Sequence, residues 1–422
     1  MRKKCRPNST IRRKCRTRWR LTAFWIKLRH RATKAFQPMK KGSFLNKKDK
    51  TMTKFLRGIM ILINIFVVLA LVLVKIGSVV SPNTALLPAY ASLGLLPIII
   101  LNIAFIVFWI MLRKWWSLLS LLALIIFSGI IKSAVPVNLT RTEADSTRTK
   151  ITLLSYNTMN TGLMKKHRKD DPNPVVQYIL DSDADIVCLQ EFAVSENKRQ
   201  FQSDDFERIF SKYPHKHVSF QLDKWRMNIG LATLSKYPII EKRNVDYESV
   251  FNLSIYTDVV IGDDTIRILN NHLESNRITS MDMKKTAELR NDFSSEKLAG
   301  ITKYLSRKMS TAYKVRAKQV DEVANVISNS PYKVISCGDY NDVPASYAYT
   351  KVKGNLKDAF RETGRGLGWT YAHSYYRFRI DYIMYDKSFR SANYKRGNLK
   401  SSDHYPIQTD LYLSKSKNYE TE

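Results

Sequence analysis

Polar side chains of the kinds used in acid–base and metal chemistry follow several apolar runs in this 422-residue chain. The stretch VISCGDYNDVPAS, residues 334–346, is apolar up to Gly338 and then places Asp339 and Asn341 two positions apart. Residues two apart at a strand end point the same way, so both face one target while Tyr340 turns back into the packing. Gly, Asp, Asn and Pro are also the usual turn residues, so this stretch alone fits a plain turn equally well.

The same arrangement recurs in five other places, where an apolar strand carries polar side chains at or near its end. Each place is weak evidence alone, because an Asn can cap a turn, a strand-end Glu can be solvated and a strand His can be exposed. Catalytic groups gather where a rigid scaffold ends, so we expect these side chains to form one site. The set comprises Asn157, Glu191, His272, Asp339, Asn341, Asp381, Asp403 and His404.

These residue types together suit metal-assisted attack of water on a phosphate ester. Glu191, Asp339 and Asp403 are hard oxygen donors of the kind that Mg²⁺ binds together with water and substrate phosphate. His272 and His404 titrate near neutral pH and can donate to phosphate oxygens that gain charge in the transition state.

Two further features support the same chemistry. A carboxylate beside an imidazole, as Asp381 is expected to be beside His404, would fix its tautomer and stabilise its cationic form. The amides of Asn157 and Asn341 can orient a phosphate or a carboxylate without adding charge. The sequence has no P-loop, GxGxxG or HExxH motif that would support rival chemistry.

The beginning of the chain has a very different composition. The formal net charge is +32, and 21 of the 69 Lys and Arg residues lie before Gly58, where Asp49 is the one acidic residue. Residues 1–57 are typical of a solvated basic tail that contacts anionic lipid or nucleic acid through charge. Initiation at Met39 or Met52 is an alternative in which most of this tail is not made.

Residues 58–136 are apolar enough for three transmembrane helices, at 58–74, 85–112 and 115–131. Each segment approaches the roughly 20 residues that a helix needs to cross a bilayer. Lys and Arg favour the cytoplasmic side, so we expect the basic tail and the Arg113–Lys114 turn inside. Three spans then place everything after Pro136 on the non-cytoplasmic face, periplasmic or extracellular. A cytoplasmic domain is the alternative if one segment does not span, most readily the first, which has Lys75 near its end.

The remainder of the chain predicts an α+β domain at 151–415, after a polar linker at 137–150 and before a short tail at 416–422. One helix is expected at 172–183, with Asn173 as its cap, and two more at 282–308 and 312–330. Two cysteines, Cys188 and Cys337, are expected to be buried free thiols, and His215 and His217 to be surface histidines. The expected strands are 151–156, 184–190, 229–235, 250–261, 265–272, 333–339, 379–386 and 406–413.

Seven motifs in this order resemble the endonuclease/exonuclease/phosphatase superfamily: LLSYNT, DIVCLQE, GLATLSKYPI, NNHLES, GDYND, RIDYIMYD and SSDHYPI. Each motif is weak, but seven in order over roughly residues 149–413 make a strong signal. The resemblance implies a four-layer αββα sandwich of two packed mixed β-sheets, here preceded by three transmembrane helices. It also implies a hydrolase of phosphate esters that depends on Mg²⁺, with Mn²⁺ as a substitute.

The resemblance also implies roles for individual residues. Glu191 would be the direct metal ligand, with Asn157 and Asp403 on the metal side of the site. Asp339 would orient or deprotonate the attacking water. Asn341 would bind phosphate, and His272 would contact the scissile phosphate. His404, paired with Asp381, would be the transition-state donor.

Substrate contacts are less well defined by the sequence. Arg226 and Asn228, just before GLATLSKYPI, are candidate cleft residues. The aromatic stretch 368–378 is either a packed hairpin or a substrate platform, with His373 and Arg377 or Arg379 as further candidates.

Three functions remain open from the sequence. A nuclease-like phosphodiesterase is favoured by the basic charge and by His272, which matches the histidine of the nuclease and sphingomyelinase branches. The abasic-site endonuclease branch usually has a different residue at this position. A lipid or inositol phosphate substrate is the alternative, because the domain is tethered beside a bilayer, although GDYNDVPAS lacks the continuation of the inositol 5-phosphatases. A non-catalytic protein that binds nucleic acid or anionic lipid is the alternative of another class. The oligomeric state is open.

Overall fold

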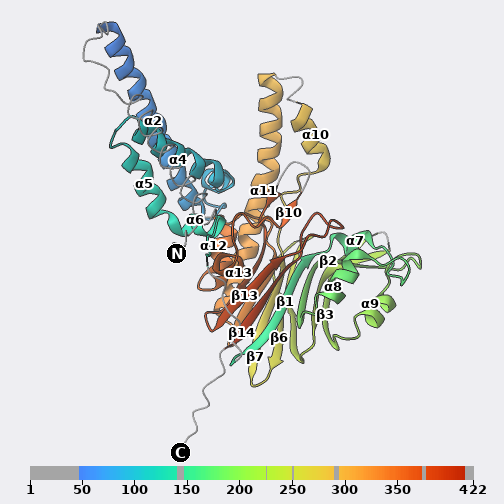
Figure 1. Cartoon of the computed structure of the whole chain (residues 1–422). Helices are drawn as coiled ribbons and strands as arrows, with labels where there is room; N and C mark the ends of the chain where they lie inside the picture. Colours follow the sequence, from blue (N-terminus) through green and yellow to red (C-terminus); the bar gives the residue numbers. More distant parts are fainter. Residues whose placement is uncertain are drawn as a thin grey trace, which may run out of the picture. The chain divides into compact units, whose positions relative to one another are not determined.

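A computed structural model describes residues 47–139, 147–224, 226–249, 251–288, 294–372 and 377–413 (Figure 1). The chain divides into two compact units, Met1–Leu62 and Ile63–Glu422. The first unit is described only as the beginning of helix α2 (Lys47–Gly77). All contacts discussed below lie within the second unit.

Apolar helices form the N-terminal part of the second unit. Two helical stretches, Thr51–Gly77 and Leu86–Met111, are long and apolar enough to cross a membrane. The second of these consists of α3 (Leu86–Ala91), the 3₁₀ turn η1 (Ser92–Gly94) and α4 (Leu95–Met111).

The third predicted span is broken in the structure. It consists of α5 (Ser117–Ile126) and α6 (Ser128–Ala134), which are bent by 70° relative to each other. The bend lies beside Ser128 and Gly129, a pair of residues at which helices commonly kink. Two of the three predicted spans are therefore helices long and apolar enough to cross a membrane, and the third is so only if the bent pair counts as one span.

A buried polar cluster joins three of these apolar helices. Asn64 of α2 donates through Nδ2 to Ser120 Oγ of α5 at 2.7 Å, and its Oδ1 accepts from Trp109 Nε1 of α4 at 2.9 Å. Hydrogen bonds of this kind hold helices together where burial of apolar surface gives no driving force.

Two six-stranded mixed sheets form the remainder of the unit, which confirms the predicted α+β class. Strands β1 and β2 pair in parallel, as do β7 and β8, and the other pairs are antiparallel. The first sheet has the order β13 (Phe389–Arg396), β14 (Ile407–Leu413), β1 (Thr149–Asn157), β2 (Ile186–Ser195), β4 (Met227–Ser235) and β3 (His215–Lys224). The second has the order β5 (Ile239–Asn244), β6 (Leu253–Ile261), β7 (Asp264–His272), β8 (Lys333–Asp339), β12 (Asp381–Tyr385) and β9 (Lys357–Asp358).

Alternation along these strands divides the apolar side chains between an inner and an outer face. The inner faces pack together through residues such as Ile186, Ile268 and Ile335. Helices α8 (Pro174–Asp181) and α9 (Ser203–Ile209) cover the outer face of the first sheet. Helices α11 (Ser295–Ser328) and α12 (Tyr347–Lys353) cover that of the second.

Helix boundaries follow the sequence signals in one place and not in another. Asn173 caps α8 as predicted, because its Oδ1 accepts from the backbone N–H groups of Val175 and Val176. The predicted division between helices at 282–308 and 312–330 is wrong. Helix α10 covers Ser280–Glu288, and α11 then runs unbroken for 34 residues, since residues 309–311 contain no Pro or Gly to interrupt it. Figure 1 shows α10 and the first half of α11 extending beyond the sheets.

The first part of the predicted linker is fixed to the domain. Val137 forms a β-bridge with Arg365, and Asn138 Nδ2 donates to the carbonyls of Arg361 and Gly364 at 3.1 and 2.7 Å. Residues 140–146 of that linker lie outside the described residues.

Cys188 and Cys337 are buried free thiols, as predicted. The prediction that His217 lies on the surface is wrong, because its position on β3 points toward the second sheet. There His217 is 7% exposed, and its Nδ1 is 2.8 Å from Thr257 Oγ1 of β6. Burial lowers the pKa of His217 from 6.5 to about 4, with a smaller effect from the charge of Lys242.

This buried histidine predicts an acid-sensitive stability. The unfolded chain binds a proton at His217 below pH 6.5, whereas the folded chain does so only near pH 4, so this contribution is lost as the pH falls. Between pH 7 and 5 the loss amounts to about 2 kcal/mol. His217→Asn, which keeps a polar atom for Thr257, should lose less stability over this range than the native chain. Chemical unfolding of the full chain in detergent at both pH values measures this, and equal losses would contradict the assignment.

Candidate active site

Strand register alone brings three of the predicted residues into one row. In the second sheet, His272 of β7 pairs with Asp339 of β8, and Asp339 pairs with Asp381 of β12. Neighbouring strands lie about 4.8 Å apart, so the three side chains become neighbours although they are far apart in sequence.

A glycine permits this register. Gly338, which precedes Asp339, has a φ of +127°, a region that side chains disfavour. A Cβ atom built on Gly338 would lie 2.0 Å from the carbonyl oxygen of Asn271 in β7. Any other residue at position 338 would therefore push β7 and β8 apart where the row of site residues begins.

The first sheet supplies Asn157, at the end of β1, and Glu191, within the neighbouring strand β2. The pairing of β2 with β4 shifts register between Leu189 and Phe192, and Glu191 there has a left-handed φ of +47°. Such a bulge re-aims a side chain without ending the strand. The expectation that the strand ends at Glu191 is therefore wrong, because β2 continues to Ser195.

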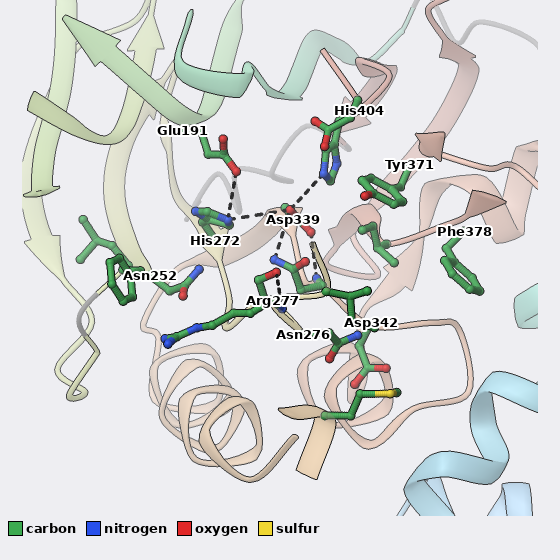
Figure 2. Close-up of a pocket in the computed structure, with 18 of the residues that line it drawn as sticks. Glu191, Asn252, His272, Asn276, Arg277, Asp339, Asp342, Tyr371, Phe378 and His404 are labelled. Atoms are coloured by element: carbon green, nitrogen blue, oxygen red, sulfur yellow. Dashed lines mark hydrogen bonds and ion pairs between the residues drawn. The ribbon is translucent and has the colours of Figure 1, made fainter. Parts of the chain in front are cut away.

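The carboxylate of Asp339 lies at the centre of the site (Figure 2). Its Oδ1 accepts from the backbone N–H of Asn341 at 2.8 Å, and its Oδ2 accepts from Asn157 Nδ2 at 3.1 Å. The Nε2 atoms of His404 and His272 lie 3.6 and 3.9 Å from Oδ2. Groups from both sheets thus converge on one carboxylate that is 1% exposed.

His404 and Asp381 form a hydrogen-bonded pair. His404 Nδ1 donates to Asp381 Oδ2 at 2.9 Å, which leaves Nε2 facing Asp339. Burial alone would lower the pKa of His404, but the charges of Asp381 and Asp339 outweigh burial and raise it well above 6.5. His404 is therefore an imidazolium at neutral pH.

The other site residues have different protonation states. Burial raises the pKa of Asp339 to about 6, and Asp381 adds to this while His404 and His272 oppose it. Burial also raises the pKa of Glu191 and lowers that of His272, which is neutral at pH 7 as a result. The site thus combines a cationic histidine, a neutral histidine and a carboxylate that titrates near neutrality.

A cavity of about 790 Å³ opens onto these groups, and Glu191, His272, Asp339, Asn341, Asp403 and His404 line it. Figure 2 shows Glu191 and His272 on one side of Asp339 and His404 with Tyr371 on the other. Asn157 and Asp381 hold these residues through their hydrogen bonds to Asp339 and His404. The structure therefore brings together all eight residues of the predicted set.

The comparison with known families agrees with this geometry. The model of the endonuclease/exonuclease/phosphatase family matches residues 154–404, which is more than half of the chain. This chain belongs to the endonuclease/exonuclease/phosphatase family. Members of the family hydrolyse phosphate esters and generally depend on a divalent metal. A domain of unknown function matches residues 57–134. No curated protein matches the chain.

Solved structures with a similar fold include an endonuclease/exonuclease/phosphatase from Beutenbergia cavernae DSM 12333, at 16% identity and a TM-score of 0.43, which covers 63% of this chain and 72% of that chain. Truncated TDP2 from Caenorhabditis elegans has 16% identity and a TM-score of 0.41, and the match covers 63% of this chain and 98% of that chain. The human Nocturnin catalytic domain with bound sulfate has 16% identity and a TM-score of 0.43, with 65% and 98% covered.

The structure separates the candidate substrate residues from this family site. Arg226 lies in the turn between β3 and β4, where its Nε is 3.3 Å from Glu196 Oε2, and neither Arg226 nor Asn228 lines the cavity. Arg379 is buried and its Nη1 donates to Asp358 Oδ2 at 2.9 Å, so it does not line the cavity either. His373 lies outside the described residues, and Arg377 is exposed on β11 (Arg377–Phe378).

Two residues of the aromatic stretch 368–378 do line the cavity. They are Tyr371 of β10 (Tyr371–Ala372) and Phe378 of β11. The Tyr371 ring meets the His404 imidazole edge to face, with ring centroids 5.0 Å apart. Strands β10 and β11 pair antiparallel, which confirms the hairpin interpretation, and the substrate platform stays a prediction.

Sequence reasoning missed Arg316, a buried residue of α11. Its Nη1 donates to the carbonyl oxygens of Glu274 and Asn341 at 2.8 and 2.7 Å, and its Nε lies 3.3 Å from Asp342 Oδ2. It thereby joins the loops that follow β7 and β8. A buried Arg beside a buried Asp is the signal that could have found it, but the two lie 26 positions apart in sequence.

Proposed function

We propose that this chain is a membrane-anchored phosphoesterase that uses Mg²⁺ to hydrolyse phosphodiester or phosphomonoester bonds. The observation that carries the proposal is the Asp339 carboxylate, which lines the cavity with the Nε2 atoms of His404 and His272 at 3.6 and 3.9 Å from its Oδ2. Such a site can activate water at one side of a phosphate and stabilise negative charge at the other.

Each side chain then has a physical task. Asp339, ionised at neutral pH, orients a water molecule and accepts its proton. His404 donates from Nε2 to a phosphate or leaving oxygen as that oxygen gains charge, while Asp381 holds the imidazolium in place. His272 offers a neutral hydrogen-bond donor to the phosphate, and Asn341 shapes the loop beside it.

The donor set fits a hard divalent cation at Glu191. Among the described residues, Asn157 is the one hydrogen-bond donor to its carboxylate, at 3.2 Å, and the side chain is about a third exposed to the cavity. Asp403 lines the same cavity and offers a second carboxylate. When bound, the cation would lower the pKa of a coordinated water and neutralise phosphate charge.

A second group of possible ligands fits a cation less well. Atoms of Asp339, Asp381 and His404 lie within 4.8 Å of one another. However, the Nδ1–H of His404 already bonds Asp381, and the protonated ring would repel a cation. Asn157 also reaches the carboxylates of Glu191 and Asp339 through its Nδ2, so it positions them rather than offering an oxygen.

The chain's own contacts support anchoring by three spans. The turn between the first two apolar stretches and the beginning of the second one contact the catalytic part: Asn83 Nδ2 donates to the carbonyl of Lys314 at 3.1 Å, and Tyr90 Oη of α3 donates to that of Ser306 at 2.8 Å. This segment and the catalytic part therefore share one face of the membrane. An even number of crossings must lie between them, which α4 and the bent α5–α6 pair supply.

The charges at the opposite end of α4 set the orientation. Arg113 and Lys114 lie there beside the stacked rings of Trp115 and Trp116, whose centroids are 4.3 Å apart, and this composition is typical of a cytoplasmic interface. The catalytic part then lies on the non-cytoplasmic face.

The metal-dependent activity is tested with the full chain in detergent and bis-p-nitrophenyl phosphate. We expect hydrolysis with Mg²⁺ or Mn²⁺ and none with EDTA. Glu191→Gln should raise the Mg²⁺ concentration for half-maximal rate at least tenfold, because it loses the ligand charge. Glu196→Gln is the matched control, since Glu196 ends the same strand region on the surface. Hydrolysis that survives EDTA, or equal Mg²⁺ dependence in both variants, would contradict the proposal.

The orientation is tested by labelling one introduced cysteine at a time in a background that lacks Cys5 and Cys15 and keeps the buried Cys188 and Cys337. A membrane-impermeant maleimide added to cells should label Val79→Cys, at an exposed position, and should label Arg113→Cys only after the membrane is permeabilised. The reverse labelling pattern would contradict the non-cytoplasmic assignment of the catalytic part. Labelling of both positions from outside would contradict the proposal of three spans.

A further inference from the structure

One wall of the active-site cavity is apolar, and a membrane helix segment supplies part of it. Leu93 of η1 lines the cavity from the segment Leu86–Met111, one of the two stretches able to span a membrane. Leu305 and Met309 line it from α11, four positions apart and hence on one face of that helix. Ile278 and Phe378 also contribute, and none of these five side chains is fully buried.

Two contacts fix Leu93 in this wall. Tyr90 Oη donates to the Ser306 carbonyl of α11, and Ser92 Oγ donates to the Ala345 carbonyl at 3.1 Å. Ala345 belongs to the loop that follows Asp339, and its side chain packs in the apolar cluster of the membrane helices with Leu71, Val74 and Leu95. The catalytic loop and the membrane helices therefore share one packed core.

Ala345 also has a φ of +132°, which an alanine adopts only when its surroundings impose it. The contact between η1 and the loop that follows Asp339 is thus specific. Leu93 of η1 and Leu305 of α11 thus line the cavity beside residues that continue into α4, a helix apolar enough to span a membrane.

The charges in the cavity do not match a nucleic-acid groove. Of the described residues that line it, Arg277 is the one Lys or Arg, and its Nη2 is already 2.6 Å from Glu274 Oε1. A groove for single-stranded nucleic acid follows the backbone with several unpaired cations. Here one end of the cavity suits a phosphate, whereas the other suits a hydrocarbon.

We propose that the substrate is a membrane amphiphile with a phosphodiester headgroup, whose hydrocarbon chain lies against Leu93, Leu305 and Met309 while the phosphate reaches Asp339. This rests on the proposed phosphoesterase function and names its substrate class. The membrane helices then act as part of the substrate site as well as an anchor. In the reaction, water forms a new P–O bond, one ester P–O bond breaks, and the displaced oxygen leaves with a proton.

Two chromogenic substrates with the same leaving group test the inference: hexadecyl 4-nitrophenyl phosphate and methyl 4-nitrophenyl phosphate. Both are given to the full chain in the same detergent micelles with Mg²⁺. We expect kcat/KM for the hexadecyl ester to exceed that for the methyl ester by at least tenfold, because the chain buries apolar surface against the wall.

Variants separate the wall from simple concentration of substrate in the micelle. Leu305→Gln, Met309→Gln and Leu93→Gln should each lower the ratio of kcat/KM for the hexadecyl ester to kcat/KM for the methyl ester several-fold, and thermal unfolding of each variant reports correct folding. Leu298→Gln is the matched control, since Leu298 is an exposed leucine of the same helix that does not line the cavity.

The outcomes distinguish this inference from the proposed function. The amphiphile proposal is contradicted if the methyl ester is hydrolysed as efficiently as the hexadecyl ester. It is also contradicted if Leu298→Gln lowers the preference for the hexadecyl ester as much as the wall variants do. Either result leaves the proposed phosphoesterase function standing. A single-stranded oligonucleotide that is cleaved with a higher kcat/KM than the hexadecyl ester, unaffected by the wall variants, also overturns the amphiphile proposal. Failure to hydrolyse either ester or the oligonucleotide overturns both proposals.

Discussion

The register of β7, β8 and β12 is the constraint on which the site depends. It places His272, Asp339 and Asp381 side by side, and Gly338 allows the close approach that this register needs. A shift of one residue in β8 would turn Asp339 toward the opposite face of the sheet. Asp381 and His404 would then keep their mutual hydrogen bond but lose the carboxylate that they face.

The site also requires the two sheets to pack in a fixed position relative to each other, because Asn157 and Glu191 come from the first sheet and Asp339 comes from the second. Buried amides connect the sheets behind the site: Gln190 Nε2 donates to Asn270 Oδ1 at 2.7 Å, and Asn270 Nδ2 donates to the Ala232 carbonyl at 3.1 Å. Buried hydrogen bonds of this kind make the packing of two otherwise apolar faces specific. The loop after β8 extends this order to the apolar helices α2 and α4 through Ala345.

Much of the site could be predicted because each motif is local: a strand, a glycine or asparagine, and the polar residue beside it. The bulge at Glu191 could not, since it depends on the pairing of β2 with β4. The burial of His217 needed the facing sheet, and the continuity of α11 was decided by the absence of a helix breaker. Leu93 joins Leu305 in one wall only through tertiary contacts across 212 positions, which no local pattern records.

The position of the metal tests the account most directly, because it divides the acidic groups between metal binding and acid–base chemistry. An experimental structure of the full chain with Mn²⁺, located by anomalous scattering, provides this measurement. The account predicts a peak within bonding distance of a carboxylate oxygen of Glu191, with the His404–Asp381 hydrogen bond intact. A peak bound between Asp381 and His404, with Glu191 free of metal, would contradict it.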